Sequence, residues 1–260
     1  MISPETDPSG VAVVETLAEL GFDYIELSLS HMTSMDEASF FALIKRVNRS
    51  GIACEACNNF FPSHLRLTGP DASLGPALDY AKAALERAGR LGAKVVVFGS
   101  SGAKNVPAGF PYDKAWGQIV DLLQALGPIA ASNGVTIAIE PLNKQESNIV
   151  TLAAEGLRLS RDVNHPHVQL LIDFYHLRRE NEDFEILIDA KAAIKHVHFA
   201  EVQSRIFPTK AEEDHLTFFN YLNKIRYAGR CSIEAYTDDF ALDARRALAT
   251  LKTIAARSGN

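Results

Sequence analysis

The stretch Val135-Thr-Ile-Ala-Ile-Glu140 shows most clearly which kind of fold this sequence specifies. Its side chains alternate, so that Thr136, Ala138 and Glu140 share one face of a strand while the branched apolar residues share the other. The apolar face suits contact with helices. Glu140 then points inward at the carboxyl end of the strand, where the catalytic residues of an α/β barrel lie.

Short apolar runs of this kind alternate with longer amphipathic stretches along the whole chain. This alternation predicts βαβ units and a parallel sheet. We expect strands at 24–29, 53–60, 94–99, 136–141, 168–174, 194–201 and 232–236. Between them, the apolar periodicity predicts helices at 11–20, 35–49, 74–90, 114–133, 152–163, 183–192, 212–225 and 242–257.

Seven strands and eight helices are one strand short of a closed (β/α)8 TIM barrel. A length of 260 residues is ordinary for one such barrel, so we predict a single domain over 1–260. The first strand is then missing or truncated: it lies upstream of this start, or Met1-Ile2-Ser3 supplies a stub. A doubly wound open sheet is the competing fold, but it normally carries a Gly-x-Gly-x-x-Gly turn, which occurs at no strand-to-helix junction here.

Composition narrows the partners and the location of the protein. The formal net charge of −6 gives no general attraction to nucleic acid, whose binding draws on clustered Lys and Arg. The N-terminus has no secretory leader pattern, and no apolar run approaches the roughly 18–20 residues that span a bilayer. We therefore expect a cytoplasmic protein that binds neither membrane nor nucleic acid. Its cysteines, Cys54, Cys57 and Cys231, are expected to be reduced thiols.

Four predicted strands end in an ionisable side chain that faces inward. Asp173 and Glu234 have the same parity as Glu140, and His198 lies nearest the mouth on its own strand. Buried together, the three carboxylates would repel one another unless they were partly protonated or a cation neutralised them, and a cation is the simpler solution. Three oxygen ligands and one nitrogen suit Mn²⁺, Mg²⁺ or Co²⁺. The sequence therefore predicts one divalent metal ion at the mouth of the barrel.

Two further residues are expected near this centre. His196 shares the inward face of its strand with His198, and we expect it to be a core residue or to orient a ligand. Glu26 closes another strand, and we expect it to support the site or to contact the substrate.

The spacing of the ionisable residues carries a specific resemblance. The motifs are Glu140, Asn143 and Glu146; Asp173-Phe-Tyr-His176; His196-Val-His198; and Glu234. On these residues the chain resembles the xylose isomerase-like TIM-barrel superfamily of sugar isomerases and epimerases. Within it, the chain is most similar to the D-tagatose 3-epimerase and D-psicose 3-epimerase group, from about Gly21 onward.

The resemblance implies a role for each matching residue. Glu140, Asp173, His198 and Glu234 would bind the metal, with Mn²⁺ the first choice, and Glu140 and Glu234 would also form the acid/base pair. Glu146 and His176 would hydrogen-bond the substrate.

Arg205 is the candidate for a further sugar contact. It stands one place later than the usual spacing, and Ile-Phe-Pro-Thr at 206–209 replaces the Pro-Gly-x-Gly segment of the epimerases.

The implied activity is epimerisation of a ketose at C3 through an ene-diolate, in a homo-oligomer. Three other functions stay open at this level: aldose–ketose isomerisation, dehydration of a keto-polyol such as an inosose or dehydroshikimate, and sugar binding without catalysis. Cleavage of abasic DNA, as in endonuclease IV, is disfavoured because that family needs further histidines and a basic DNA-binding face.

Overall fold

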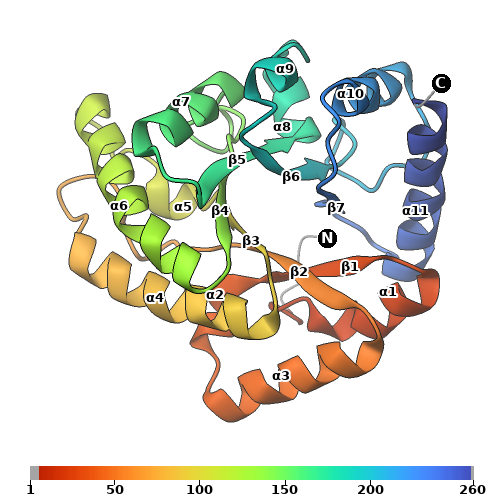
Figure 1. Ribbon diagram of the computed structural model, residues 1–260, viewed down its shortest axis with the longest axis horizontal. Coiled ribbons are helices and arrows are strands. Elements are labelled where there is room, and N and C mark those ends of the chain that lie inside the picture. Colours follow the sequence, from red (N-terminus) through yellow and green to blue (C-terminus); the bar gives the residue numbers. More distant parts are fainter. Residues whose placement is uncertain (1–5, 259–260) are drawn as a thin grey trace.

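The computed structural model describes residues 6–258 (Figure 1). Its seven strands form one sheet in which all neighbours are parallel and spatial order follows chain order. The strands are β1 (Tyr24–Ser28), β2 (Ala53–Asn58), β3 (Val95–Phe98), β4 (Thr136–Ile139), β5 (Val168–Asp173), β6 (Ile194–Phe199) and β7 (Arg230–Ile233).

Helices surround the curved sheet, as Figure 1 shows. They are the 3₁₀ helix η1 (Val11–Val13) and the α-helices α1 (Val14–Leu20), α2 (Leu29–Ser34), α3 (Glu37–Ser50), α4 (Leu74–Leu91), α5 (Ser101–Lys104), α6 (Tyr112–Ser132), α7 (Ala153–Val163), α8 (Phe174–Arg179), α9 (Ile186–Ala190), α10 (Glu213–Lys224) and α11 (Phe240–Arg257). The predicted TIM barrel is confirmed.

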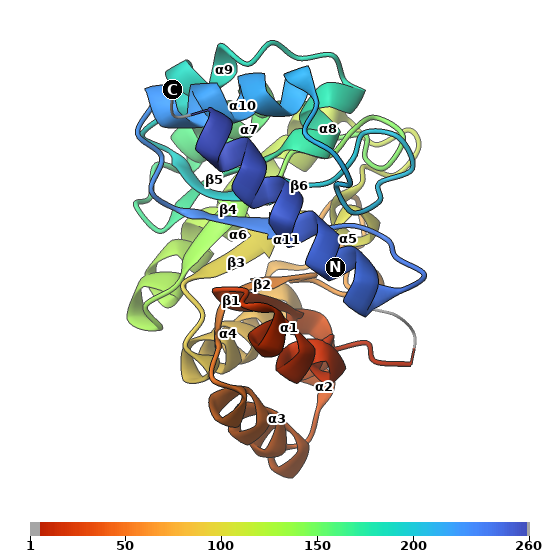
Figure 2. The same ribbon diagram turned by 90° about the vertical axis from the view of Figure 1, so that its right-hand side faces the viewer.

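The barrel is nearly closed. Within residues 6–258 no strand lies between β7 and β1, which confirms that the first strand is absent or short. The stub predicted at Met1-Ile2-Ser3 lies outside the described residues. On the outer side of this gap α1 and α11 contact each other, and Figure 2 shows α11 running across this side of the barrel.

Local sequence explains why the helices form where they do. In α4 the buried side chains recur every three or four residues, which places them on the face toward the sheet. Helix α3 begins at Asp36, whose carboxylate accepts a hydrogen bond from the backbone N of Ser39. It ends at Gly51, whose φ of 87° closes the last turn.

The core lies mainly between the sheet and the helices. A small separate cluster of Val97, Ala138 and Leu171 fills the inside of the barrel, on strands β3, β4 and β5. Ala138 and Leu171 share the parity of Glu140 and Asp173, so the predicted inward faces of β4 and β5 are confirmed.

Three short helices were not predicted. α2, α5 and α8 each begin within three residues of the end of a strand, and each has at most six residues. Such segments are too short to show a helical period in the sequence.

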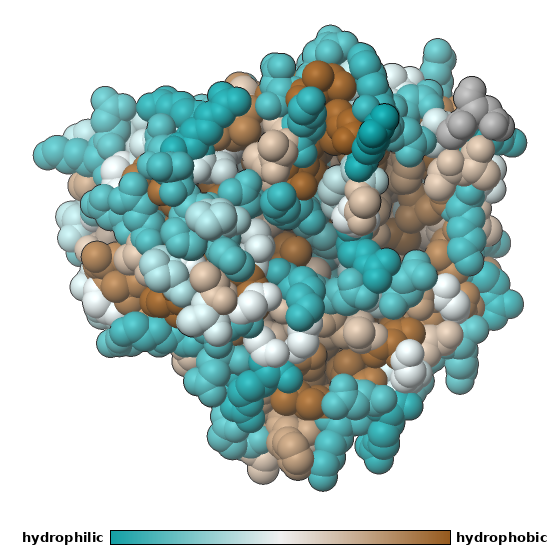
Figure 3. Space-filling model, in the orientation of Figure 1, coloured by the Kyte–Doolittle hydropathy of each residue, from teal (hydrophilic) through white to brown (hydrophobic). Residues whose placement is uncertain are grey.

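The surface and the cysteines complete the description. None of the helices in the described range has the length and hydropathy that crossing a membrane requires. Hydrophilic side chains cover most of the face seen in Figure 3. All three cysteines are free thiols, as predicted.

Candidate metal centre and active site

The register of the sheet brings the four predicted ligands to one end of the barrel. Asp173, the last residue of β5, pairs with His198 on β6. Glu140 and Glu234 follow β4 and β7 directly, and both continue the strand ladder. The backbone N of Glu140 donates to Phe98 O (3.1 Å), and that of Glu234 donates to Phe199 O (3.2 Å).

The four side chains form one compact cluster. Glu140, Asp173, His198 and Glu234 each offer a ligand atom, and these atoms lie within 4.8 Å of one another. His198 Nδ1 is 3.1 Å from Glu140 Oε1 and 3.3 Å from Glu234 Oε2. Three of the four residues are buried, and Glu234 is partly buried. The structure thus brings together the residues that the sequence singled out.

Burial and neighbouring charges move the pKa values of the carboxyl groups apart. Burial raises the pKa of Glu140, and the nearby Glu234 raises it further. Burial also raises the pKa of Asp173, to about 7, although Arg205 acts against this. For Glu234, burial is outweighed by His198 and Arg205, so its pKa lies well below the usual range. The two glutamates therefore have opposite preferences for a proton.

The same carboxylates also shift the pKa of His198. Burial lowers its pKa, but the carboxylates of Glu26 and Glu234 outweigh burial, and the pKa of His198 lies well above its ordinary value. The cluster therefore favours positive charge at its centre.

The donor set and its surroundings fit a divalent cation. Three carboxylates and one imidazole nitrogen are suitable ligands for Mn²⁺ or Mg²⁺. Asn58 adds a buried oxygen, Oδ1, that has no hydrogen-bond partner among the described residues, while its Nδ2 donates to Glu234 Oε1 (3.3 Å). Gly99 makes room for the cluster, because a Cβ there would collide with Glu140 Oε2.

The predicted substrate-binding residues lie beside the cluster and contact one another. His176 Nδ1 accepts from the backbone N (3.1 Å) of Asn143 and lies 2.8 Å from its Nδ2. The Nε2 of His176 therefore carries the proton and faces the site, 3.6 Å from Asp173 Oδ2. Asn143 Nδ2 also donates to Glu146 Oε1 (2.9 Å), which links the two motif residues.

Arg205 covers the carboxylates from the loop after β6. Its guanidinium forms ion pairs with Glu234, with Glu146 (3.2 Å) and with Asp173 (3.4 Å). Ser204 and Arg205 both have positive φ, 65° and 49°, and this turn directs the arginine back over the site. The shifted spacing in the sequence does not keep Arg205 away from the cluster.

Glu26 was predicted only as a neighbour, and the structure gives it a definite place. Its two oxygens lie 3.0 Å from His198 Nε2 and 2.9 Å from His196 Nε2. His196 contacts Glu26 and Ser232. The sequence signal was the position of Glu26 near the end of a strand.

Lys104 was missed altogether. This side chain is fully buried, and its Nζ donates a hydrogen bond to the backbone O of Glu140 (3.1 Å). Burial lowers the pKa of Lys104 to about 8. It lies at the end of the four-residue helix α5, where no periodicity marks it as buried.

The sequence is similar to those of several curated proteins. The chain is 27% identical over 231 residues to D-psicose 3-epimerase of Agrobacterium fabrum, covering 86% of this chain and 78% of that protein. It is 30% identical over 134 residues to 3-dehydro-D-guloside 4-epimerase of Escherichia coli, covering 47% and 51%. These relatives are named as epimerases, which agrees with the predicted isomerase class.

A solved structure shows the same fold. D-allulose 3-epimerase from Methylomonas sp., in complex with D-allulose, superposes with a TM-score of 0.85 at 22% identity, covering 96% of this chain and 93% of that one. At this identity the likeness bears on the fold alone. The model of the family described as xylose isomerase-like TIM barrel matches residues 14–254. The chain therefore belongs to the xylose isomerase-like TIM barrel family.

Proposed function

We propose that this protein is a divalent-metal-dependent ketose 3-epimerase with Glu140 and Glu234 as its acid/base pair. One observation carries the proposal. The two glutamates come from different strands, both lie within 3.3 Å of His198 Nδ1, and their pKa values are displaced in opposite directions. The names of the epimerase relatives support a ketose as the substrate.

Glu140, Asp173, His198 and Glu234 would hold the ion. When bound, a divalent ion supplies Lewis acidity, which polarises a substrate carbonyl and makes the adjacent C–H acidic.

Two carboxyl groups with opposite protonation states are what epimerisation requires. Glu234, whose pKa is low, is ionised and can accept the proton from C3. Glu140, whose pKa is raised, would be the partner that supplies a proton to the opposite face of the same carbon. In the reverse direction the two roles exchange.

The neighbouring residues would bind and orient the sugar. His176 presents an Nε2–H donor toward the site, and Glu146 offers carboxylate oxygens to hydroxyl groups. Arg205 closes the site from above and, with its five N–H donors, can replace its carboxylate contacts with substrate oxygens.

Deuterium exchange tests this proposal directly. Protein loaded with Mn²⁺ would be incubated in D₂O with free ketoses, ketose phosphates and inososes, and NMR would follow deuterium incorporation and new products. The variants Glu140→Gln and Glu234→Gln keep the size of each side chain and remove its proton transfer. Glu55→Gln, on β2 and ion-paired with Arg230, is the matched control.

We expect deuterium at C3 together with the C3 epimer, both lost in the two site variants and retained in Glu55→Gln. A C1–C2 product would instead identify an isomerase, and loss of water a dehydratase. Metal binding without any exchange would point to a sugar-binding protein.

We further propose that Mn²⁺ is the native ion, that residues 1–260 form one domain, and that the protein is a cytoplasmic homo-oligomer. Elemental analysis of protein purified without added metal tests the first point. A single cooperative unfolding transition and the mass measured by light scattering test the domain and the oligomer. Cell fractionation tests the location.

A further inference from the structure

We propose that Glu26 is a positioning residue that holds the Nε2–H of His198 and thereby aims Nδ1 of the same ring at Glu140 and Glu234. The proposal deepens the proposed function and rests on it for the metal. The arrangement of Glu26 itself stands on the contacts of the described residues.

The two ring nitrogens of His198 face different carboxylates: Nε2 faces Glu26, and Nδ1 faces Glu140 and Glu234. An ionised carboxylate only accepts, so His198 Nε2, 3.0 Å from Glu26 Oε1, must be the donor. His196 Nε2 donates in the same way to the other oxygen at 2.9 Å. Nδ1 of His198 faces the two glutamates, so it is the nitrogen that would exchange its proton for a cation, while Glu26 retains the proton on Nε2.

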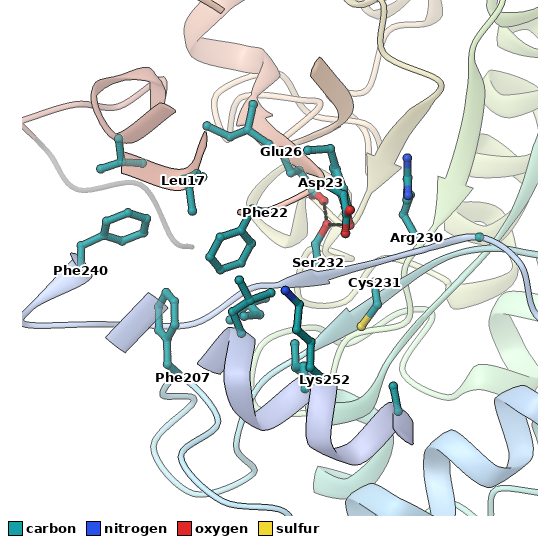
Figure 4. A pocket seen from close by; sticks show the side chains of 18 of the residues that line it. Leu17, Phe22, Asp23, Glu26, Phe207, Arg230, Cys231, Ser232, Phe240 and Lys252 are labelled. Atoms are coloured by element: carbon teal, nitrogen blue, oxygen red, sulfur yellow. Dashed lines mark hydrogen bonds between the residues drawn. The ribbon is translucent and has the colours of Figure 1, made fainter. Parts of the chain in front are cut away.

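The carboxylate is itself held in place from a second side. Ser232 Oγ donates to Glu26 Oε2 (2.6 Å) and lies 2.7 Å from the hydroxyl of Tyr24. Figure 4 shows the bond between Glu26 and Ser232 at the wall of a cavity of about 300 Å³ between α1, β1, β7 and α11. This chain of hydrogen bonds joins β1 to β7, so Glu26 links the two ends of the sheet to the ligand imidazole.

Burial of the three side chains supports the same assignment. The side chains of Glu26, His196 and His198 are all at most 8% exposed, so their mutual hydrogen bonds are shielded from competing water. A buried carboxylate that orients a metal-binding imidazole also raises its basicity, and removing such a partner weakens metal affinity by about 10–100-fold.

Two substitutions and one control test the role. Glu26→Leu removes both acceptors at similar size, and Glu26→Gln is the milder change in case the leucine variant does not fold. Glu55→Gln breaks the ion pair with Arg230 (2.6 Å), which also joins an early strand to β7 but does not touch His198. Thermal unfolding confirms that each variant is folded.

Two readouts separate this role from a general structural one. Long-range ¹H–¹⁵N spectra of the metal-free protein report whether His198 Nε2 carries a hydrogen-bonded, slowly exchanging proton. Calorimetry with Mn²⁺ gives the affinity and the number of ions per chain. We expect the Nε2–H signal in the wild type and in Glu55→Gln, its loss in Glu26→Leu, and an affinity reduced about 10–100-fold, with Glu26→Gln intermediate.

Three results would overturn the inference. The first is a folded Glu26 variant with the His198 signal intact and Mn²⁺ affinity within twofold of the wild type. The second is an equal loss of affinity in Glu55→Gln. The third is two ions per chain falling to one, which would make Glu26, His196 and His198 ligands of a second ion. If the wild type binds no Mn²⁺ at all, the proposed function fails, while the spectra still decide the role of Glu26.

Discussion

Replacing Lys104 with methionine should stabilise the metal-free protein at neutral pH. Lys104 is fully buried in α5, with its ammonium 5.9 Å from the ring of Phe98 and hydrogen-bonded to Glu140 O. Burial lowers its pKa from 10.5 to about 8, and the opposing effect of the Glu140 charge does not cancel this. Holding the group charged at pH 7 therefore costs free energy that an uncharged side chain of similar length avoids.

The magnitude follows from the shift in pKa. A fall of 10.5 − 8 = 2.5 corresponds to about 3.4 kcal/mol at 1.36 kcal/mol per unit, as an order of magnitude. Loss of the hydrogen bond to Glu140 O destabilises the variant by about 1 kcal/mol. Lys104→Met should therefore be about 2 kcal/mol more stable than wild type at pH 7. Between pH 8 and 10.5 the unfolded state holds more protons than the folded one, so wild-type stability rises with pH. The advantage of the variant should therefore shrink by about 2 kcal/mol from pH 7 to pH 9.5.

Urea unfolding with a chelator present, at pH 7, 8.25 and 9.5, measures both quantities. Lys82→Met is the control, because Lys82 is exposed on helix α4 and its ion pair with Asp79 spans one turn. We expect its effect to stay within about 0.5 kcal/mol at every pH. A difference between wild type and Lys104→Met that does not change with pH, or a variant less stable than wild type at pH 7, would refute the reasoning.

Three further outcomes follow from the geometry. Because burial raises the pKa of Asp173 to about 7 and the pKa of His198 is also raised, Mn²⁺ affinity should rise at least about tenfold per pH unit from pH 5.5 to 7 and continue to rise above pH 7; calorimetry showing a flat profile would contradict this. Gly99→Ala should displace Glu140 and lower Mn²⁺ affinity at least about tenfold, whereas Gly75→Ala, in open space on α4, should leave it unchanged. Phe218→Ala, in the aromatic cluster formed on the buried face of α10, should lower the free energy of unfolding by about 3–5 kcal/mol, and a loss below 1 kcal/mol in urea titration would show that the cluster does not support the fold.

The barrel and most of its site could be read from the sequence because both depend on local patterns. Strand parity assigns an inward face to Glu140 and Asp173 without knowledge of any distant contact, and parallel strands bring their carboxyl ends to one edge. The predicted elements accordingly agree with the observed ones to within a few residues. Helix η1 and helix α1 together replace the single helix expected at 11–20.

The contacts of Glu26 and Lys104 could not be predicted in the same way. Glu26 meets His198 across a separation of 172 residues, so the contact depends on how far the sheet curves. A register shift between Ile25 and Glu26 also breaks the simple alternation of β1. Lys104 is buried by the packing of a short helix against Glu140, and a lysine in a polar segment ordinarily indicates solvent exposure.

The four strands that carry the ligand cluster, β4 to β7, lie next to one another in the second half of the chain. The aromatic core of Phe174, Phe184, Phe199 and Phe218 packs with β5 and β6, and it is separate from the larger cluster, which packs around the first half of the chain and also includes Ile139 on β4 and Ile233 on β7. Divergence is therefore constrained unequally. The segments after β1 and β2 can change in length and sequence without moving a ligand, provided that Glu26 is retained, whereas the segment after β3 holds Gly99 and Lys104 against Glu140. New substrate ranges should accordingly arise in the first half of the chain, and a library randomised at the segments after β1 and β2 samples them while the reaction centre is kept intact.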